Sequence, residues 1–242
     1  QPTHIICAFD MGAKTFRNEL YSDYKANRQA PPEELVPQFD QLWELVEAFD
    51  IPCIGVKSYE ADDVIGSLAK TYSAQNNRVS IVSGYCELLQ LIDDHISVHL
   101  MKKGFGNYES VHKLNLNELR GLQHPEQIIE MKALMGDSAD NIPGCPKVGP
   151  KTALKLLEQF HDVDGIFAQI DQVKGKLKER LLENRDLIYL SRELASIRTD
   201  LDLDCSLEQC RYQVNRPRLI AKLEDLEFKN LSKQFETQVS SS

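Results

Sequence analysis

The stretch Tyr59-Glu60-Ala61-Asp62-Asp63 decides how this chain is organised. An apolar, β-rich run at residues 51–56 precedes it, and a run with apolar residues at helical spacing follows it. This pattern predicts a strand, then a group of acids, then a helix over residues 62–74. Open α/β sheets place their functional sites where a strand ends and the next helix begins. We therefore expect a functional site at this stretch.

Two interpretations compete for the three carboxylates of this stretch. Acidic residues in a first helical turn complement the helix dipole by about 0.3–1 kcal/mol each, which accounts for one or two acids. Three clustered acids repel one another unless a cation lies among them. Carboxylate oxygens suit hard cations such as Mg²⁺ or Mn²⁺, so the stretch favours a metal site over simple helix capping.

Length and composition limit the class of protein. The chain has 242 residues, of which 42% are hydrophobic, so it can bury a core and global disorder is excluded. No apolar run approaches the roughly 20 residues that a membrane span needs, and we expect no membrane partner. The chain starts at Gln1 without a methionine, which suggests a fragment. Six scattered cysteines without a C-x-x-C pair indicate reduced, buried thiols in a cytosolic protein.

The net charge of −9 argues against broad nonspecific binding to polyanions, but its distribution is uneven. Residues 141–157 contain three lysines and no acid. Residues 14–28 mix basic and aromatic side chains, among them Arg17, Tyr24, Lys25 and Arg28. Such mixing suits a nucleic-acid backbone, with rings free to stack on bases. A solvated amphipathic helix explains this segment equally well.

Strands and helices alternate in the first half of the chain. Strands are expected at residues 3–9, 51–56, 78–84 and 96–101, with helices at 33–49 and 62–74. This order is typical of an α/β protein with a parallel twisted sheet flanked by helices. From about residue 115 the pattern is helical to the end, with the last helices near residues 163–170, 175–183, 186–196 and 216–235. We predict an α/β core at residues 1–113 and an all-α region at 114–242.

A glycine-bracketed hairpin lies between two predicted helices at about residues 125–160. Its sequence is Gly144-Cys-Pro-Lys-Val-Gly149-Pro-Lys-Thr-Ala153. Glycine at both bends allows positive φ and close backbone approach, and the start of the following helix can bind a phosphate. This pattern favours a helix-hairpin-helix that reads the DNA backbone, over an ordinary turn between helices. The hairpin lacks the spacing of a nucleotide-binding P-loop.

Acidic residues recur after the predicted strands and before the hairpin. The set comprises Asp10, Glu60, Asp62, Asp63, Glu87, Asp137 and Asp140. The first five follow strands, so they can converge on one edge of the sheet. Paired cations held by such carboxylates catalyse phosphodiester hydrolysis without a covalent nucleophile, and the sequence contains no convincing catalytic triad.

Several motifs together resemble the 5′-nuclease family, which comprises flap endonucleases and the amino-terminal 5′→3′ exonuclease domain of bacterial DNA polymerase I. The matching pieces are Phe9-Asp10, Phe16-Arg17, Tyr24-Lys25-Ala-Asn-Arg28, Tyr59–Asp63, Met135–Gly144 and Val148–Ala153. They occur in the family's order over nearly the whole chain. The resemblance implies a PIN-like core, a helical arch at about residues 14–35, a helix-hairpin-helix that often binds K⁺, and two divalent metal ions.

The resemblance also implies roles for individual residues. Asp10, Glu60, Asp62 and Asp63 would hold the first metal ion, with Asp62 and Asp63 counted as catalytic. Glu87, Asp137 and Asp140 would help to hold the second. Lys25 and Arg28 would neutralise the scissile phosphate and Tyr24 would stack on a base. The DNA-binding set is Arg17, Tyr24, Lys25, Arg28, Gly144, Lys147, Val148, Gly149, Lys151 and Thr152.

Two departures from the family pattern matter. The family begins with a further strand that carries a metal-binding aspartate, and this chain lacks it. Where the family has Gly-Asp-(Lys/Arg)-Asp, the chain has Gly84-Tyr85-Cys86-Glu87. Either Tyr85 replaces an aspartate, or three residues are missing in a gapped alignment. In both cases the second metal site loses a carboxylate and should be weaker.

The expected function is a metal-dependent, structure-selective 5′-nuclease of DNA replication and repair. It would act as a monomer on 5′ flaps, nicks and 5′ ends in the bacterial cytoplasm. Two alternatives stay open at this point. One is a catalytically impaired DNA-binding module of the same fold, because a strand and a ligand are missing from this form. The other is a PIN-type ribonuclease, which would not need the lysine-bearing hairpin.

Overall fold

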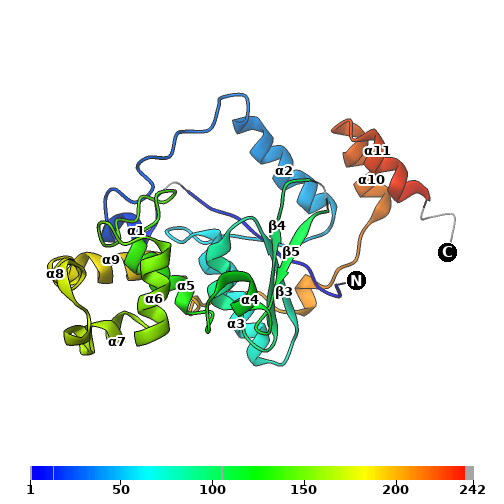
Figure 1. Ribbon diagram of the computed structural model, residues 1–242. Coiled ribbons are helices and arrows are strands. Elements are labelled where there is room, and N and C mark those ends of the chain that lie inside the picture. Colours follow the sequence, from blue (N-terminus) through cyan, green and yellow to red (C-terminus); the bar gives the residue numbers. More distant parts are fainter. Residues whose placement is uncertain (1, 13, 105, 238–242) are drawn as a thin grey trace.

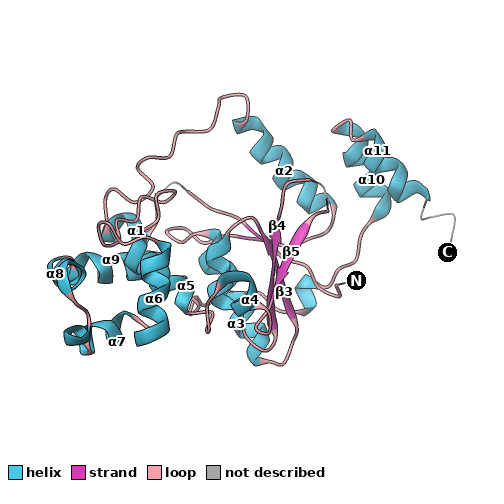
Figure 2. Ribbon diagram, in the orientation of Figure 1, coloured by secondary structure: helices cyan, strands magenta, loops and turns pink. Residues whose placement is uncertain are grey.

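The computed structural model describes residues 2–12, 14–104 and 106–237, and its strands form two small sheets (Figure 2). In the first, β1 (Cys7–Ala8) pairs in parallel with β2 (Cys53–Ile54). In the second, β3 (Val79–Ser83) pairs in parallel with β4 (Ile96–Met101). The α/β class and the parallel pairing are as predicted.

The structure adds one strand and shortens two others. β5 (Tyr108–Val111) runs antiparallel to β4 and was not predicted, because only Val111 of its four residues is buried and the strand shows little hydrophobic alternation. The strands expected at residues 3–9 and 51–56 shrink to two residues each, since only these residues form a ladder with each other. The amino-terminal stretch is fixed elsewhere: the Ile5 N–H donates to the Cys210 carbonyl at 2.9 Å.

Helices flank the sheets, and loops connect them (Figure 1). Those of the first half are α1 (Phe16–Leu20), α2 (Val36–Ala48), α3 (Ala61–Ala74) and the 3₁₀ helix η1 (Cys86–Leu91). The second half contains α4 (Leu116–Arg120), α5 (Gln127–Met135), α6 (Pro150–Phe160), α7 (Val163–Ala168), η2 (Ile170–Gln172), α8 (Gly175–Glu183), α9 (Arg185–Ala195), η3 (Glu208–Cys210), α10 (Arg216–Asp225) and α11 (Lys229–Thr237). The helix predicted at residues 216–235 is thus two helices, α10 and α11, which are separated at Glu227, whose φ is +59°.

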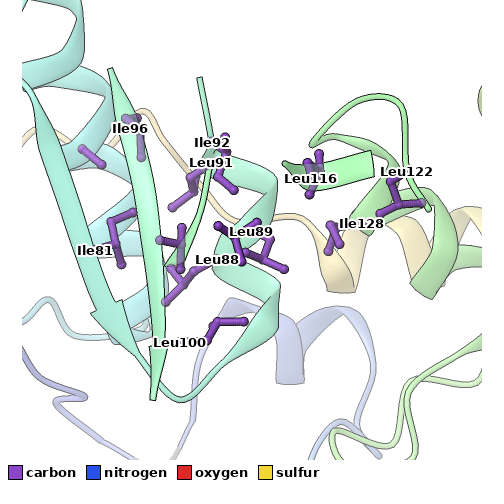
Figure 3. Close-up of a cluster of buried hydrophobic side chains, with 13 residues drawn as sticks. Ile81, Leu88, Leu89, Leu91, Ile92, Ile96, Leu100, Leu116, Leu122 and Ile128 are labelled. Carbon is purple, nitrogen blue, oxygen red and sulfur yellow. The ribbon is translucent and has the colours of Figure 1, made fainter. Parts of the chain in front are cut away.

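The main core lies between the three-stranded sheet and η1 (Figure 3). Alternate residues of β4, Ile96, Val98 and Leu100, point into it together with Leu88 and Leu89 of η1. The core extends across the predicted boundary at residue 113, because Leu116, Leu122 and Ile128 also belong to it. The division into residues 1–113 and 114–242 stays a prediction.

A second core holds the helical region together. It comprises Leu134, Val148, Leu157, Phe160, Ile166, Leu181 and Ile188, among others. Helix α5 connects the two cores, since it packs against both η1 and α9. The Gln90 side chain adds a polar link by donating to the Ala195 carbonyl at 3.1 Å. This arrangement places the start of η1 beside the loop that follows α5.

The expected helical arch at residues 14–35 is helical only in part. Helix α1 covers five residues, a run of turns follows at residues 22–27, and the chain to Pro32 has no regular structure. Consecutive prolines at 31 and 32 break any helix there. Ala13 lies outside the described residues. Among the described helices, none is long and apolar enough to cross a membrane.

Candidate active site

Three carboxylates gather where β1 ends and α3 begins. Asp10 follows β1 by two residues, and its Oδ1 accepts a hydrogen bond from the Ala61 N–H at 2.7 Å. Glu60 directly precedes α3, and Asp62 lies in its first turn. We call Asp10, Glu60 and Asp62 the first acidic cluster. Strand end and helix start bring these side chains together, as the sequence predicts.

The electrostatics of Asp62 reflect this crowding. Burial raises the pKa of Asp62 first of all, and the negative charges of Glu60, Glu87 and Asp10 raise it further, to about 7. Lys25 acts in the opposite direction and lowers it. Without a bound cation, the first acidic cluster therefore carries more negative charge than its surroundings compensate. A divalent cation would relieve this repulsion.

The third acid of the stretch, Asp63, has a different role from the one predicted. Its side chain is 0% exposed, and the Arg17 guanidinium donates to both of its carboxylate oxygens at 2.7 and 2.8 Å. Backbone N–H groups of Glu60 and Arg198 donate to the same carboxylate. Asp63 thus has no oxygen free for a metal ion, and its prediction as a metal ligand and catalytic residue is wrong.

The same ion pair corrects the prediction for Arg17. Its side chain is only 2% exposed, and it also donates to the carbonyl oxygens of Leu194 and Ser196. A guanidinium buried in this way cannot reach a nucleic acid. Arg17 instead connects α1 to α3 and to the end of α9. The Phe-Arg pair of the motif is a structural brace.

A second group of acids lies beside the first. One carboxylate oxygen from each of Glu87, Asp137 and Asp140 lies within 4.8 Å of the others, which suits a metal ion. We call these residues the second acidic cluster. Asp137 is fixed by its Oδ1, which accepts the Ala139 N–H at 2.9 Å. Two elements contribute, because η1 carries Glu87 and the loop after α5 carries the aspartates.

The two clusters share one cavity. Its volume is about 20 Å³, enough for roughly one water-sized particle. Its lining includes Glu60, Asp62, Glu87, Asp140 and the side chain of Lys132. Four of the seven predicted acids thus line this cavity, and Asp10 and Asp137 adjoin it through Asp62 and Glu87. Asp63 alone is separated from it by its pairing with Arg17.

Two of the predicted basic residues reach these acids. The Lys25 ammonium lies 2.5 Å from Glu60 Oε1, and the Arg28 guanidinium lies 2.5 Å from Asp140 Oδ1. Backbone contacts hold their segment against the loop after α5, since the Lys25 N–H donates to the Asp140 carbonyl at 2.9 Å. The Asn27 amide donates to the Ser138 carbonyl in the same interface. The residues 21–28 are thus positioned over the second acidic cluster.

Tyr24 is placed differently from the prediction. Its side chain is 4% exposed and packs with Ile142 and Leu194, while its hydroxyl donates to Glu60 Oε2 at 3.2 Å. A ring buried in this way has no free face for a base. The expectation that Tyr24 stacks on DNA is therefore wrong for this structure, and its hydroxyl orients Glu60 instead.

The hairpin joins α5 to α6 and exposes its lysines. Lys147, Lys151 and Lys155 are all exposed, whereas Val148 is buried in the second core and offers only its backbone. Gly144 has a φ of +62°, and a Cβ there would lie 2.1 Å from the Gly136 nitrogen. Only glycine fits this position, because the two backbones touch.

Gly149 does not need positive φ, contrary to the expectation. Its φ is −105° and its ψ is 179°, which other residues adopt readily, and it precedes the first residue of α6. The space around its Cα is open, with no described atom within 4 Å of an added Cβ. Thr152 lies half-buried in the first turn of α6. The start of α6 is therefore accessible to a ligand.

Sequence reasoning missed several residues near the site. Lys132 lines the shared cavity and pairs with two of its acids. A search for cations that balance the acids would have found it five residues before Asp137. Lys174 and Lys176 are exposed at the start of α8, which lies beside the hairpin, because Arg180 reaches the Lys147 carbonyl. These two lysines form a second basic run in the sequence, and that run could have indicated them as candidates.

The expectation of buried cysteines holds only in part, since Cys86 is exposed.

Solved structures with the same fold are known. The chain resembles the bacteriophage T5 5′-exonuclease with bound zinc at a TM-score of 0.66 and 23% identity, covering 98% of this chain and 83% of that one. It resembles the catalytic core of Rad2 in complex with DNA substrate at a TM-score of 0.60 and 16% identity, covering 94% and 77%. At such identities the likeness shows the fold alone. The class is thus a PIN-like α/β protein with a helical carboxyl-terminal region, as expected.

Sequence comparisons identify the family. Residues 1–118 match the 5′-3′ exonuclease N-terminal resolvase-like domain, and residues 123–218 match the 5′-3′ exonuclease C-terminal SAM fold. This chain therefore belongs to the 5′-3′ exonuclease family, which confirms the expected resemblance.

Two curated relatives illustrate the family. DNA polymerase I of Bacillus caldotenax is 43% identical over 242 residues, which are 99% of this chain and 28% of that protein. A 5′-3′ exonuclease of Bacillus subtilis is 38% identical over 236 residues, which are 98% of this chain and 79% of that protein. The chain thus spans about a quarter of the length of that polymerase and most of the length of that exonuclease.

Proposed function

We propose that this chain is a structure-selective 5′-nuclease that hydrolyses phosphodiester bonds of DNA with the help of divalent metal ions. The observation that carries the proposal is the meeting of the two acidic clusters at one cavity, beside Lys25 and Arg28. The membership of the chain in the 5′-3′ exonuclease family supports it. The substrates proposed are 5′ flaps, nicks and duplex 5′ ends.

The donor set of the cavity fits hard divalent cations. Carboxylate oxygens suit Mg²⁺ and Mn²⁺, and the second acidic cluster has three of them within 4.8 Å of one another. The first acidic cluster would hold one ion and the second cluster the other. When bound, such ions supply a nucleophilic water and stabilise charge on the phosphodiester oxygens.

The basic side chains would act on the phosphate. Lys25 and Arg28 pair with Glu60 and Asp140 in the structure, at the rim of the cavity. With cations bound to these acids, the ammonium and guanidinium groups would be free to neutralise the scissile phosphate. The Tyr24 hydroxyl orients Glu60 by donating to its Oε2. Lys25 and Arg28 would thus bind and orient the substrate without transferring a proton.

The hairpin would hold the duplex part of the substrate. Exposed lysines and the accessible start of α6 suit phosphates and carry little base information. The set proposed for DNA comprises Gly144, Lys147, Val148, Gly149, Lys151 and Thr152, with a K⁺ ion at the hairpin. We propose a monomer in the bacterial cytoplasm, in keeping with the bacterial relatives.

The two alternatives are less well supported. A DNA-binding module without turnover would not need two acidic clusters at one cavity with basic groups beside it. A PIN-type ribonuclease would not need the lysine-bearing hairpin, and the family match covers the hairpin region. A cleavage assay separates the nuclease from a DNA-binding module. A competition assay separates it from a ribonuclease, because an RNA substrate would compete with the labelled DNA only if the chain were a ribonuclease.

A labelled 5′-flap DNA with Mg²⁺ tests the proposal. We expect Asp62→Asn and Asp137→Asn to lose cleavage, since each removes a carboxylate from one acidic cluster. Asp94→Asn is the matched control, because Asp94 is exposed and pairs with Lys113. Gel shifts run in parallel show whether the variants still bind the flap. Equal cleavage by the parent and both cluster variants would refute the proposal.

A further inference from the structure

Lys132 lines the shared cavity, and the proposed mechanism gives it no role. It lies on α5, five residues before Asp137, and its side chain is 11% exposed. Its ammonium pairs with both the Glu87 and the Asp137 carboxylates. These acids come from different elements, η1 and the loop after α5, so the ammonium lies between two parts of the second acidic cluster.

The two clusters differ in how far the protein itself neutralises them. Lys132 pairs with Glu87 and Asp137, and Arg28 pairs with Asp140, so every carboxylate of the second cluster has a basic partner. In the first cluster Lys25 pairs with Glu60, while Asp10 accepts a backbone N–H and pairs with no basic side chain among the described residues. A divalent ion that enters the second cluster must therefore displace or repel a buried ammonium.

The connection from β3 to η1 supplies few further ligands. Its residues are Gly84 and Tyr85, and in the first turn of η1 Glu87 contributes the carboxylate to the cluster. The Tyr85 ring is 56% exposed and the phenol is a poor ligand for a hard cation. A buried ammonium is costly unless well paired, and here two carboxylates pair with it. Lys132 and Arg28 thus offset two of the three negative charges of the second cluster, whereas Lys25 is the basic residue that pairs with the first cluster at its rim.

We propose that the Lys132 ammonium is the resident cation of the second acidic cluster, so that tight binding of a divalent ion is confined to the first cluster. This inference rests on the proposed function, because it concerns the same metal centre. Lys132 is then a positioning residue that holds Glu87 and Asp137 together. It sets how many divalent ions the chain binds tightly.

Counting bound Mn²⁺ tests the inference without relying on catalysis. Electron paramagnetic resonance of free Mn²⁺, together with titration calorimetry, gives the number and affinity of bound ions. The parent should bind one ion tightly and a second at least tenfold more weakly. Lys132→Met keeps the length of the side chain and removes the charge, so the second ion should bind at least tenfold more tightly than in the parent.

Two control variants make the result specific. Lys132→Arg keeps a positive charge at the cluster and should retain the parent's pattern of one tight and one weak ion. Lys113→Met removes one exposed lysine that pairs with Asp94 outside the cavity, and it should change neither ion. Circular dichroism verifies that each variant is folded. If Lys132→Met fails to fold, the Lys132→Arg and parent titrations still decide, since two equally tight ions in either would overturn the inference.

The outcomes separate this inference from the proposed function. If the parent and all variants bind no Mn²⁺, the metal centre of the proposed function fails, and the inference fails with it. If the parent binds Mn²⁺ and Lys132→Met shows the same second affinity, only the role of Lys132 is overturned. A tighter second ion in Lys132→Met alone is the result we expect.

Discussion

Two helices of this protein begin at the sites proposed for metal ions and for DNA, and their first turns carry opposite charges. Helix α3 starts among Glu60, Asp62 and Asp63, whereas α6 starts at Pro150 with Lys151 next to it. Every helix start carries a partial positive charge. At α3 the protein's own acids complement it, and at α6 the lysines add to it. The first arrangement suits cations held by surplus carboxylates, and the second suits an external phosphate.

The starts of α3 and α6 also differ in how tightly the surrounding protein packs against them. At α3, Asp63 accepts from Arg17 and from two backbone N–H groups and is fully buried. This brace fixes the turn from which Glu60 and Asp62 project. At α6, Gly149 lies in extended backbone with open space around it. One start is thus closed and braced by the fold, and the other is left open to a ligand.

The largest effect is expected from breaking the brace at α3. Arg17→Ala leaves the Asp63 carboxylate buried without its guanidinium partner, and removing one partner of a buried ion pair costs about 3–5 kcal/mol of stability. Urea unfolding measures this loss. The control is Arg218→Ala, which breaks an exposed pair with Asp50 and should cost about 0–1 kcal/mol. Equal losses in both variants would mean that Asp63 is not braced, and would reopen its role as a metal ligand.

A smaller effect on stability is expected from removing the charge of Asp62 at the start of α3. The pKa of Asp62 rises from 3.8 to about 7 in the folded protein. Between these values the folded, metal-free protein keeps a proton that the unfolded chain has released, so its stability falls as the pH rises towards 7. Asp62→Asn removes this loss, and the variant should be more stable than the parent by about 1–3 kcal/mol at pH 8, since each pKa unit corresponds to about 1.4 kcal/mol and neighbouring carboxylates titrate together.

Unfolding in urea and EDTA at two pH values measures this dependence. The gain from Asp62→Asn should be larger at pH 8 than at pH 5, because the parent is still protonated at pH 5. Asp94→Asn serves as a control, since Asp94 is exposed. A gain that is independent of pH would show that packing, and not charge, separates the variant from its parent.

The opposite charges at the starts of α3 and α6 could be predicted from the sequence, but the contacts of the individual side chains could not. Carboxylates after predicted strands and lysines around the hairpin were visible as patterns, because residue type and strand order fix them. The sequence could not show that Asp63 faces Arg17, since a helical turn of acids has inward and outward positions that only tertiary packing distinguishes. Tyr24 was misjudged for the same reason, since it reaches the cavity through contacts between segments distant in sequence.

The smallest effect, and the most specific, concerns the open start of α6. Lys151→Ala removes one exposed ammonium, so duplex DNA should bind more weakly and the log–log salt slope should fall in magnitude by about 1, with Mn²⁺ binding unchanged. Gly149→Val should weaken binding further, because a branched side chain would fill the open space through which a phosphate approaches, although the extended backbone accepts valine and the protein should fold normally. Fluorescence anisotropy on duplex DNA at several salt concentrations measures both, with Lys113→Ala as the control. If Lys151→Ala keeps the parent's affinity and slope, the start of α6 is a structural turn, and the contrast with α3 has no counterpart in DNA binding.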